Sequence, residues 1–458
     1  MPPPRALLTE GPVPRVLLAF VLPTLASSVL QSLSGSINAA WIGRLLGQSA
    51  LAAVTNANSL LFFLLGATFG LGLAATVLVA QSLGARDPVT AKKTIGTSLS
   101  FFGGVSILMA ALGFAFAPTM LEWMHTPPDV IPLASSYLRI IFAAFPAIVL
   151  YSFVMMSLRG AGDSKTPFFF LALSVVLDGG LNPLLIRGIG PFPQLGIAGA
   201  AMATLISQWV SLVALIGWLY LKKHPLRFTA GEWRYLGIDR RVLHALVVKG
   251  IPMGLSVIVI SASMLAMISL VNRNGSQVTA AYGACFQLWS YIQMPSLALG
   301  SAVSSMAAQN VGAKLWVRVN EIARVGVIFS IAMTTALILM VTLLDRSAFA
   351  IFLGSDEAAI LIALHIHAVV SWSFILLGVS FVLSSVVRAT GAVLQPLAIL
   401  VVALWFVRIP FAYALTPSLH AEAIWWSFPL GSGVSVVLSY AYYRFGGWRE
   451  AQMLDLVR

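Results

Sequence analysis

The sequence contains few charged residues and a single cysteine. Charged residues make up 9% of the 458 positions, whereas a soluble globular chain carries about 25%. Too few polar side chains are present to cover a water-facing surface, so the composition excludes a soluble globular fold and indicates a protein surrounded mostly by lipid. The lone cysteine, Cys285, excludes an intramolecular disulfide.

Apolar runs of the length that crosses a bilayer, about 20 residues, recur along the whole chain. They lack the alternation of barrel strands, so the sequence predicts an all-α integral membrane protein. Charges and turn clusters divide the chain into twelve predicted transmembrane helices. Their extents are 16–37, 50–81, 94–118, 131–157, 167–186, 195–221, 244–271, 278–310, 322–344, 358–387, 396–416 and 421–443.

Basic residues are distributed unequally between the two sets of loops. One set, together with both ends of the chain, carries 21 Lys and Arg residues, and the other set carries 4. Because short cytoplasmic loops are enriched in Lys and Arg, we expect both termini to be cytoplasmic. The net charge of +12 belongs to these loops, so we expect no nucleic-acid partner.

The two halves of the chain repeat each other. LPTLASSVLQ at 22–31 matches IPMGLSVIVI at 251–260, and AQSLGA at 80–85 matches AQNVGA at 308–313. Six spans per half give both halves the same orientation, as in secondary transporters whose substrate lies between two lobes. A channel or a membrane enzyme remains an alternative. The predicted parts are an N-terminal lobe (1–221), a cytoplasmic linker (222–243) and a C-terminal lobe (244–458).

One acidic residue, Asp178, lies well inside a predicted span. A charge at the bilayer centre costs about 2.5–3.5 kcal/mol on insertion scales. Because a low dielectric favours the neutral form of a carboxyl group, we predict that Asp178 couples ion movement by binding and releasing a proton. The alternative is a structural aspartate beside Gly179 and Gly180.

The spans lack the paired groups that catalysis needs. A single in-span acid does not make an enzyme, and nothing resembles a nucleotide-binding loop, so we expect neither catalysis nor a cofactor. His365 and His367 are two residues apart and point to different helix faces, so we expect no metal site.

Five motifs together resemble the multidrug and toxic compound extrusion (MATE) transporters. They are ALAA (50–53), VAQSLGARDP (79–88), LRGAGDSKTP (158–167), MPSLALGSAVSSMAAQNVGA (294–313) and FVRIPFAYAL (406–415). The resemblance implies an antiporter of the inner or plasma membrane. It would export organic cations by alternating between inward- and outward-open states, driven by H⁺ or Na⁺.

The chain departs from the family pattern in its first lobe. Asn38 stands where many members carry an aspartate, and Asp178 and Asn182 reverse the usual order of Asn and Asp. We expect a cavity in which Asp178 is flanked by Asn38, Asn182, Gln31 and Asn56. An asparagine cannot exchange a proton, but it can donate and accept hydrogen bonds.

The second lobe lacks the acids of some sodium-coupled members, a Glu near Ile260 and an Asp near Ala392. The sequence therefore favours H⁺ over Na⁺ as the coupling ion. We predict an H⁺-coupled exporter of drugs or organic cations, monomeric and surrounded by lipid. The alternatives are a Na⁺-coupled exporter and a flippase for lipid-linked oligosaccharides.

Aromatic and polar residues in the eighth span could line a substrate cavity. Gln287, Trp289, Tyr291 and Met294 suit flat aromatic cations, although Trp and Met in a span also serve packing. Pro23 removes a helix hydrogen bond and is a candidate hinge of the first span, with a fixed kink as the alternative.

Overall fold

The computed structural model describes residues 8–123, 126 and 130–454, and these form helices joined by turns without any strand. Ten of the predicted spans coincide with single helices, 358–387 with a pair of helices, and 396–416 with a helix that changes its winding. The all-helical prediction is confirmed. In the described part, nine helices are long and apolar enough to cross a membrane, and one bent pair makes a tenth.

The described helices divide into two compact units. The first unit contains residues 22–250, and the second contains residues 8–21 and 251–454. The chain passes from one unit to the other within two long helices, α1 (Val13–Leu46) and α7 (Arg240–Asn272). Both passages lie two residues before a proline of the repeat, Pro23 or Pro252.

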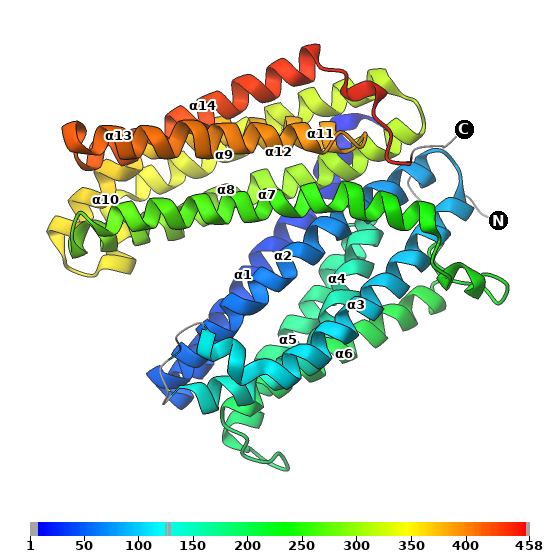
Figure 1. Cartoon of the computed structure of the whole chain (residues 1–458), viewed down its shortest axis with the longest axis horizontal. Helices are drawn as coiled ribbons and strands as arrows, with labels where there is room; N and C mark the ends of the chain where they lie inside the picture. Colours follow the sequence, from blue (N-terminus) through cyan, green and yellow to red (C-terminus); the bar gives the residue numbers. More distant parts are fainter. Residues whose placement is uncertain (1–7, 124–125, 127–129, 455–458) are drawn as a thin grey trace. The chain divides into compact units, whose positions relative to one another are not determined.

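The first unit is a helical bundle built around α4 (Figure 1). Besides parts of α1 and α7, it contains α2 (Gln48–Gly84), α3 (Pro88–Trp123), α4 (Ile131–Gly160), α5 (Lys165–Arg187), α6 (Ile197–Leu221) and the 3₁₀ turn η1 (Trp233–Leu236). The helix α4 packs against α2, α3 and α6, and more than half of its residues are buried, as expected of a central helix.

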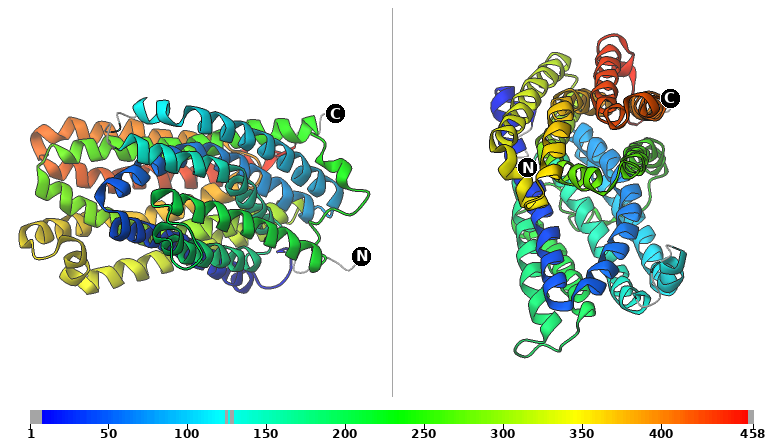
Figure 2. Two further views of the ribbon diagram at one scale, coloured as in Figure 1. Left: turned by 90° about the horizontal axis from the view of Figure 1, so that it is seen from below. Right: turned by 90° about the vertical axis from the view of Figure 1, so that its left-hand side faces the viewer.

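The second unit is a helical bundle in which α8 and α11 pack against each other and against further helices (Figures 1 and 2). Its helices are α8 (Ser276–Gly312), α9 (Trp316–Leu353), α10 (Glu357–Val370), α11 (Ser373–Arg388), α12 (Leu394–Val401), η2 (Val402–Arg408), α13 (Ile409–Leu419), α14 (Ala421–Phe445) and η3 (Trp448–Glu450). An aromatic cluster of Tyr282, Trp289, Phe374, Trp425 and Phe428 fills the core between α8, α11 and α14.

Two predicted spans are irregular in the structure. The predicted run 358–387 is a pair of helices, α10 and α11, that bend by 45°. The predicted run 396–416 is continuous, but η2 within it is a π-helix. Pro410 follows η2 and has no N–H to donate to the preceding turn, so the wider winding accommodates the missing hydrogen bond.

The internal repeat extends to local geometry. In α1 the hydroxyl of Ser27 donates to the carbonyl of Pro23 over 2.8 Å, and in α7 Ser256 donates to Pro252 over 3.0 Å. Each hydroxyl therefore satisfies the carbonyl at a proline of the repeat. After α2 and α8, Arg86 and Lys314 take the same left-handed conformation, with φ of 58° and 59°.

The segment after α6 docks on α3 within the first unit. Lys92 forms a salt bridge with Glu232 at 2.5 Å, and Ser100 donates to the carbonyl of Leu236 at 2.5 Å. Burial alone would raise the pKa of Glu232, but the hydrogen bonds from Lys92 and Thr229 outweigh it and lower this pKa to about 2. The ionised pair fixes the segment at one end of the helices.

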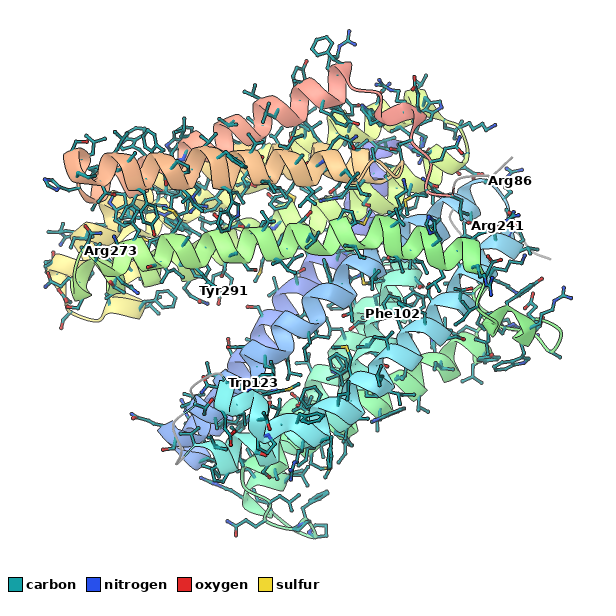
Figure 3. All side chains as sticks on the ribbon, viewed as in Figure 1. Arg86, Phe102, Trp123, Arg241, Arg273 and Tyr291 are labelled. Atoms are coloured by element: carbon teal, nitrogen blue, oxygen red, sulfur yellow. The ribbon has the colours of Figure 1, made fainter. Side chains whose placement is uncertain are left out.

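The end of the first unit that carries this segment is basic. Arg86 and Arg241 lie at this end, and Trp123 lies at the opposite end (Figure 3). Both arginines belong to the loops that the charge distribution assigns to the cytoplasm. The predicted orientation, with both termini in the cytoplasm, requires these two arginines to lie at the same end.

Gly96 in α3 permits the close approach of the docked segment, since a Cβ there would lie 1.9 Å from the carbonyl oxygen of Tyr235. We predict that Gly96→Ala displaces residues 233–237 and increases tryptic cleavage at Lys222 and Lys223 several-fold. The matched control is Gly104→Ala in the same helix, where a Cβ meets no atom within 4 Å. Equal cleavage of the two variants would contradict the docking.

Candidate functional site: a buried aspartate network

Asp178 lies on α5 and receives hydrogen bonds from two neighbouring helices. Its Oδ2 accepts from Nδ2 of Asn38 on α1 over 2.5 Å, and its Oδ1 accepts from the hydroxyl of Thr204 on α6 over 3.0 Å. The carboxylate is 6% exposed. Both of its oxygens are therefore paired with neutral donors in a nearly closed environment.

Asn182 extends the network by one helical turn. It lies four residues after Asp178 on the same face of α5. Its Nδ2 donates to Oδ1 of Asn38 over 3.0 Å and to the backbone oxygen of Asp178 over 2.8 Å. The Oδ1 atom of Asn182 is buried and has no hydrogen-bond partner among the described residues. A buried amide oxygen one turn from Asp178 is thus available to accept a hydrogen bond or to coordinate a cation.

No basic side chain forms a salt bridge with Asp178 in the described part of the chain. The titratable side chain of Tyr137, on α4, interacts electrostatically with Asp178. The in-span Arg139 contacts another side chain, since its guanidinium lies 5.6 Å from the centroid of the Phe114 ring. The network can therefore change its charge by binding a cation without first releasing an internal partner.

The structure brings together three of the predicted cavity residues. Asn38 and Asn182 join Asp178, whereas Gln31 is exposed and Asn56 is half-buried, and neither forms a hydrogen bond with the described residues. Thr204 was missed by the sequence analysis. The available signal was a threonine followed by Ser207 and Gln208 inside an apolar run, but their order alone does not place them against Asp178.

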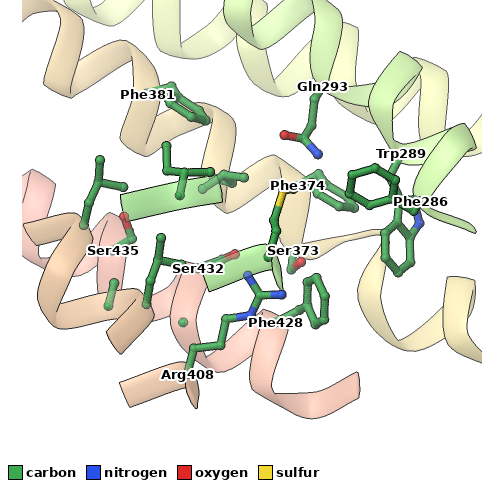
Figure 4. Close-up of a pocket in the computed structure, with 17 residues that line it drawn as sticks. Phe286, Trp289, Gln293, Ser373, Phe374, Phe381, Arg408, Phe428, Ser432 and Ser435 are labelled. Carbon is green, nitrogen blue, oxygen red and sulfur yellow. The ribbon is translucent and has the colours of Figure 1, made fainter. Parts of the chain in front are cut away.

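The residues predicted on the eighth span divide between two faces of α8. Trp289 is 1% exposed and lines a cavity within the second unit, together with Phe286 and Gln293 (Figure 4). Gln287 and Tyr291 are exposed on the other face and contact each other at 3.5 Å. Met294 is half-buried and does not line this cavity. Helical periodicity explains the division, because residues 286, 289 and 293 share one face and 287, 291 and 294 another.

The two histidines of α10 have different surroundings. His365 contacts Glu422 at 2.6 Å, and His367 lies against Phe349 and Thr342. A search of the described residues finds no group of three or more His, Cys, Asp or Glu side chains that could hold a metal ion.

These features define a class, a multi-pass integral membrane protein with two repeated helical halves. The family model described as MatE matches the chain twice, over residues 23–184 and 252–414. The chain therefore belongs to the MatE family, which confirms the resemblance to MATE transporters. The double match also confirms the internal repeat.

Curated relatives cover almost the whole chain. The chain is 37% identical to the "Probable multidrug resistance protein YoeA" of Bacillus subtilis, over 97% of this chain and 96% of the relative. It is 34% identical to the "Probable multidrug resistance protein YpnP" of the same organism, over 97% and 98%. It is also 28% identical to an "FAD transporter" of Shewanella oneidensis, over 67% of each protein.

Solved structures share the fold. A crystal structure described as MATE in the bent conformation matches with a TM-score of 0.87 at 20% identity, over 96% of each chain. An outward-facing multidrug resistance MATE family transporter matches with a TM-score of 0.86 at 20% identity, over 95% of this chain and 96% of the other. At this identity the likeness concerns the fold alone.

Thr204 offers a test of the network that does not depend on transport. We predict that Thr204→Val extends the labelling of Asp178 by a carbodiimide, which reacts with the protonated carboxyl, to a pH higher by about one unit. The lost hydrogen bond stabilises the charged carboxylate, and a bond to a charged group contributes about 1.5–3 kcal/mol. Mass spectrometry measures the labelling.

The control for this test is Thr204→Ser, which retains the hydroxyl and should label like the wild type. If the valine and serine variants label at the same pH, the hydrogen bond from Thr204 has no effect on the ionisation of Asp178.

Proposed function

We propose that this protein exports organic cations, including drugs, in exchange for H⁺, and that Asp178 is the group that carries the proton. The observation behind the proposal is a buried carboxylate that neutral donors hold without a basic partner among the described residues. The names of the curated relatives support drug export as the direction of transport. The site of transport is the inner or plasma membrane, with both termini in the cytoplasm.

The network can serve both protonation states of Asp178. The charged carboxylate accepts hydrogen bonds from Asn38 and Thr204. After protonation the carboxyl needs an acceptor, and an amide that has rotated by half a turn presents its oxygen to the new O–H. Asn38 stands where many family members carry a second acid. By rotating its amide it can pair with either protonation state of Asp178, and it stays neutral in both.

Exchange of one H⁺ for one monovalent cation moves no net charge. The membrane potential, worth about 2.3 kcal/mol per charge per 100 mV, then cancels. Transport is driven by the pH gradient, at about 1.4 kcal/mol per pH unit, which corresponds to tenfold accumulation. The pH gradient and the potential can be collapsed separately, so their contributions can be measured.

Na⁺ coupling is the second candidate, and one feature favours it. The Oδ1 of Asn182 has no hydrogen-bond partner among the described residues and lies one helical turn from Asp178, and carboxylate and amide oxygens are the ligands of hard cations. The same residues would then hold Na⁺ in place of a proton. Dependence of efflux on Na⁺ at constant pH distinguishes the two.

We predict that Asp178→Asn abolishes efflux of a fluorescent monovalent cation in everted vesicles, at least a hundredfold, because an amide cannot carry a proton. Wild-type efflux should stop when the pH gradient is collapsed at constant potential, and should not require Na⁺. Fluorescence recovery measures the rate.

The matched control is Glu122→Gln, which changes an exposed acid at the end of α3. It should transport like the wild type. The proposal fails if Asp178→Asn keeps wild-type efflux at normal expression. If wild-type efflux strictly requires Na⁺, the coupling ion is Na⁺ and not H⁺.

Pro23 is the proposed hinge of the alternating-access cycle. It interrupts the hydrogen bonds of α1, and the chain passes between the two units directly before it, at Val21 and Leu22. The missing N–H of Pro23 leaves the carbonyl of Ala19, four residues earlier, without its usual helical donor, which makes α1 easier to bend at this point.

We predict that Pro23→Ala slows efflux about tenfold and leaves the substrate Kd within twofold, since the variant stiffens α1 without changing the network. Vesicle efflux and equilibrium binding measure the two quantities. Pro118→Ala, a proline within α3, is the control and should change neither. An unchanged efflux rate for Pro23→Ala would indicate a fixed kink.

A further inference from the structure

The second unit contains a small, partly enclosed cavity that the coupling proposal does not use. It has a volume of about 70 Å³ and is lined by side chains from α7, α8, α11, α12, η2 and α14 (Figure 4). A buried water needs about 10–15 Å³ of such space, so the cavity has room for several waters or for the polar end of an organic molecule. Its contents depend on the charge of its walls.

Arg408 is the charged residue among the described side chains that line the cavity. It is 8% exposed, and its Nε and Nη2 atoms have no hydrogen-bond partner among the described residues. No acid forms a salt bridge with it in that part of the chain. A buried charge without an ionic or hydrogen-bond partner is costly, so an anionic ligand would stabilise this guanidinium.

The two free donors of Arg408 lie on the same edge of the guanidinium. Nε–H and the outer Nη2–H run parallel along that edge, which is the geometry that matches the two oxygens of a carboxylate. The plane of the group is fixed, because its Cζ lies 3.6 Å from the centroid of the Phe428 ring. Gly431 leaves room for the side chain, since a Cβ there would approach the Cβ of Arg408 to 3.1 Å.

The remaining walls are aromatic with a few neutral polar groups. Phe286, Trp289 and Phe374 line the cavity with Phe428, and Gln293 and Ser373 add groups that can form hydrogen bonds (Figure 4). A positive charge would be repelled by Arg408, whereas an aromatic ring would pack against these side chains. The lining therefore favours a ligand that joins a carboxylate to an aromatic ring.

We propose that this cavity binds the carboxylate of an aromatic organic acid or zwitterion through the Nε–Nη2 edge of Arg408. The site lies wholly within the second unit and does not involve Asp178, so it does not depend on the proposed coupling. The ligands of this site would carry a negative group, unlike the cations of the proposed exchange.

The test is titration calorimetry of the purified full-length protein with benzoate and with benzamide, its neutral analogue of the same shape. Benzoate should bind the wild type at least tenfold more tightly than benzamide. Arg408→Lys, which keeps the charge but loses the two parallel donors, should weaken benzoate at least tenfold, and Arg408→Gln should reduce it to the level of benzamide.

Two controls separate this site from other effects. Arg139→Gln removes the other in-span arginine, which is exposed, and should leave benzoate binding unchanged. Asp178→Asn should also bind benzoate like the wild type, which distinguishes this site from the coupling site.

Three results would overturn the proposal. Equal affinity of the wild type for benzoate and benzamide would leave only an aromatic cavity, and this comparison needs no variant to fold. Unchanged benzoate binding by Arg408→Lys would exclude the two-donor edge. Displacement of benzoate by chloride or inorganic phosphate at equal concentration would indicate a site for small inorganic anions.

Discussion

The first unit depends on one electrostatic constraint, a carboxylate in a nearly closed environment with neutral donors as its only hydrogen-bond partners among the described residues. Asn38, Thr204 and the paired amide of Asn182 stabilise the charge of Asp178, and none of them cancels it. Because the stabilisation comes from dipoles, a proton or a small cation can be added at modest cost. An arginine in place of one of these neutral donors would have held Asp178 in its charged form.

The same constraint explains why the network draws on three helices. Two donors for one carboxylate cannot come from α5 itself, whose N–H groups are used within the helix, so α1 and α6 each provide one. Movement of α1 would alter the hydrogen bond from Asn38 directly. Pro23 lies in that helix, and this connects the proposed hinge with the proposed coupling group through a single element.

The two units treat their buried charges differently although their folds repeat. The first unit surrounds an acid with amides and a hydroxyl, and the second holds Arg408 against Phe428 with two donors free. The π-helix before Pro410 carries Arg408 at its last position, so the irregular winding sets the direction of the guanidinium. The two proposed sites would thus bind groups of opposite sign.

Composition, loop charges and internal similarity were sufficient to predict the helical class, the twelve helical segments and the repeat, because lipid restricts backbone structure so strongly. Asp178 was recognisable because an acid in an apolar run is costly, and Asn38 and Asn182 followed from the family pattern. Only the tertiary structure placed Thr204 beside Asp178, separated Trp289 from Tyr291, and left the donor edge of Arg408 without a hydrogen-bond partner among the described residues. These outcomes depend on helix rotation and packing between distant segments, which the order of residues along a uniformly apolar helix does not fix.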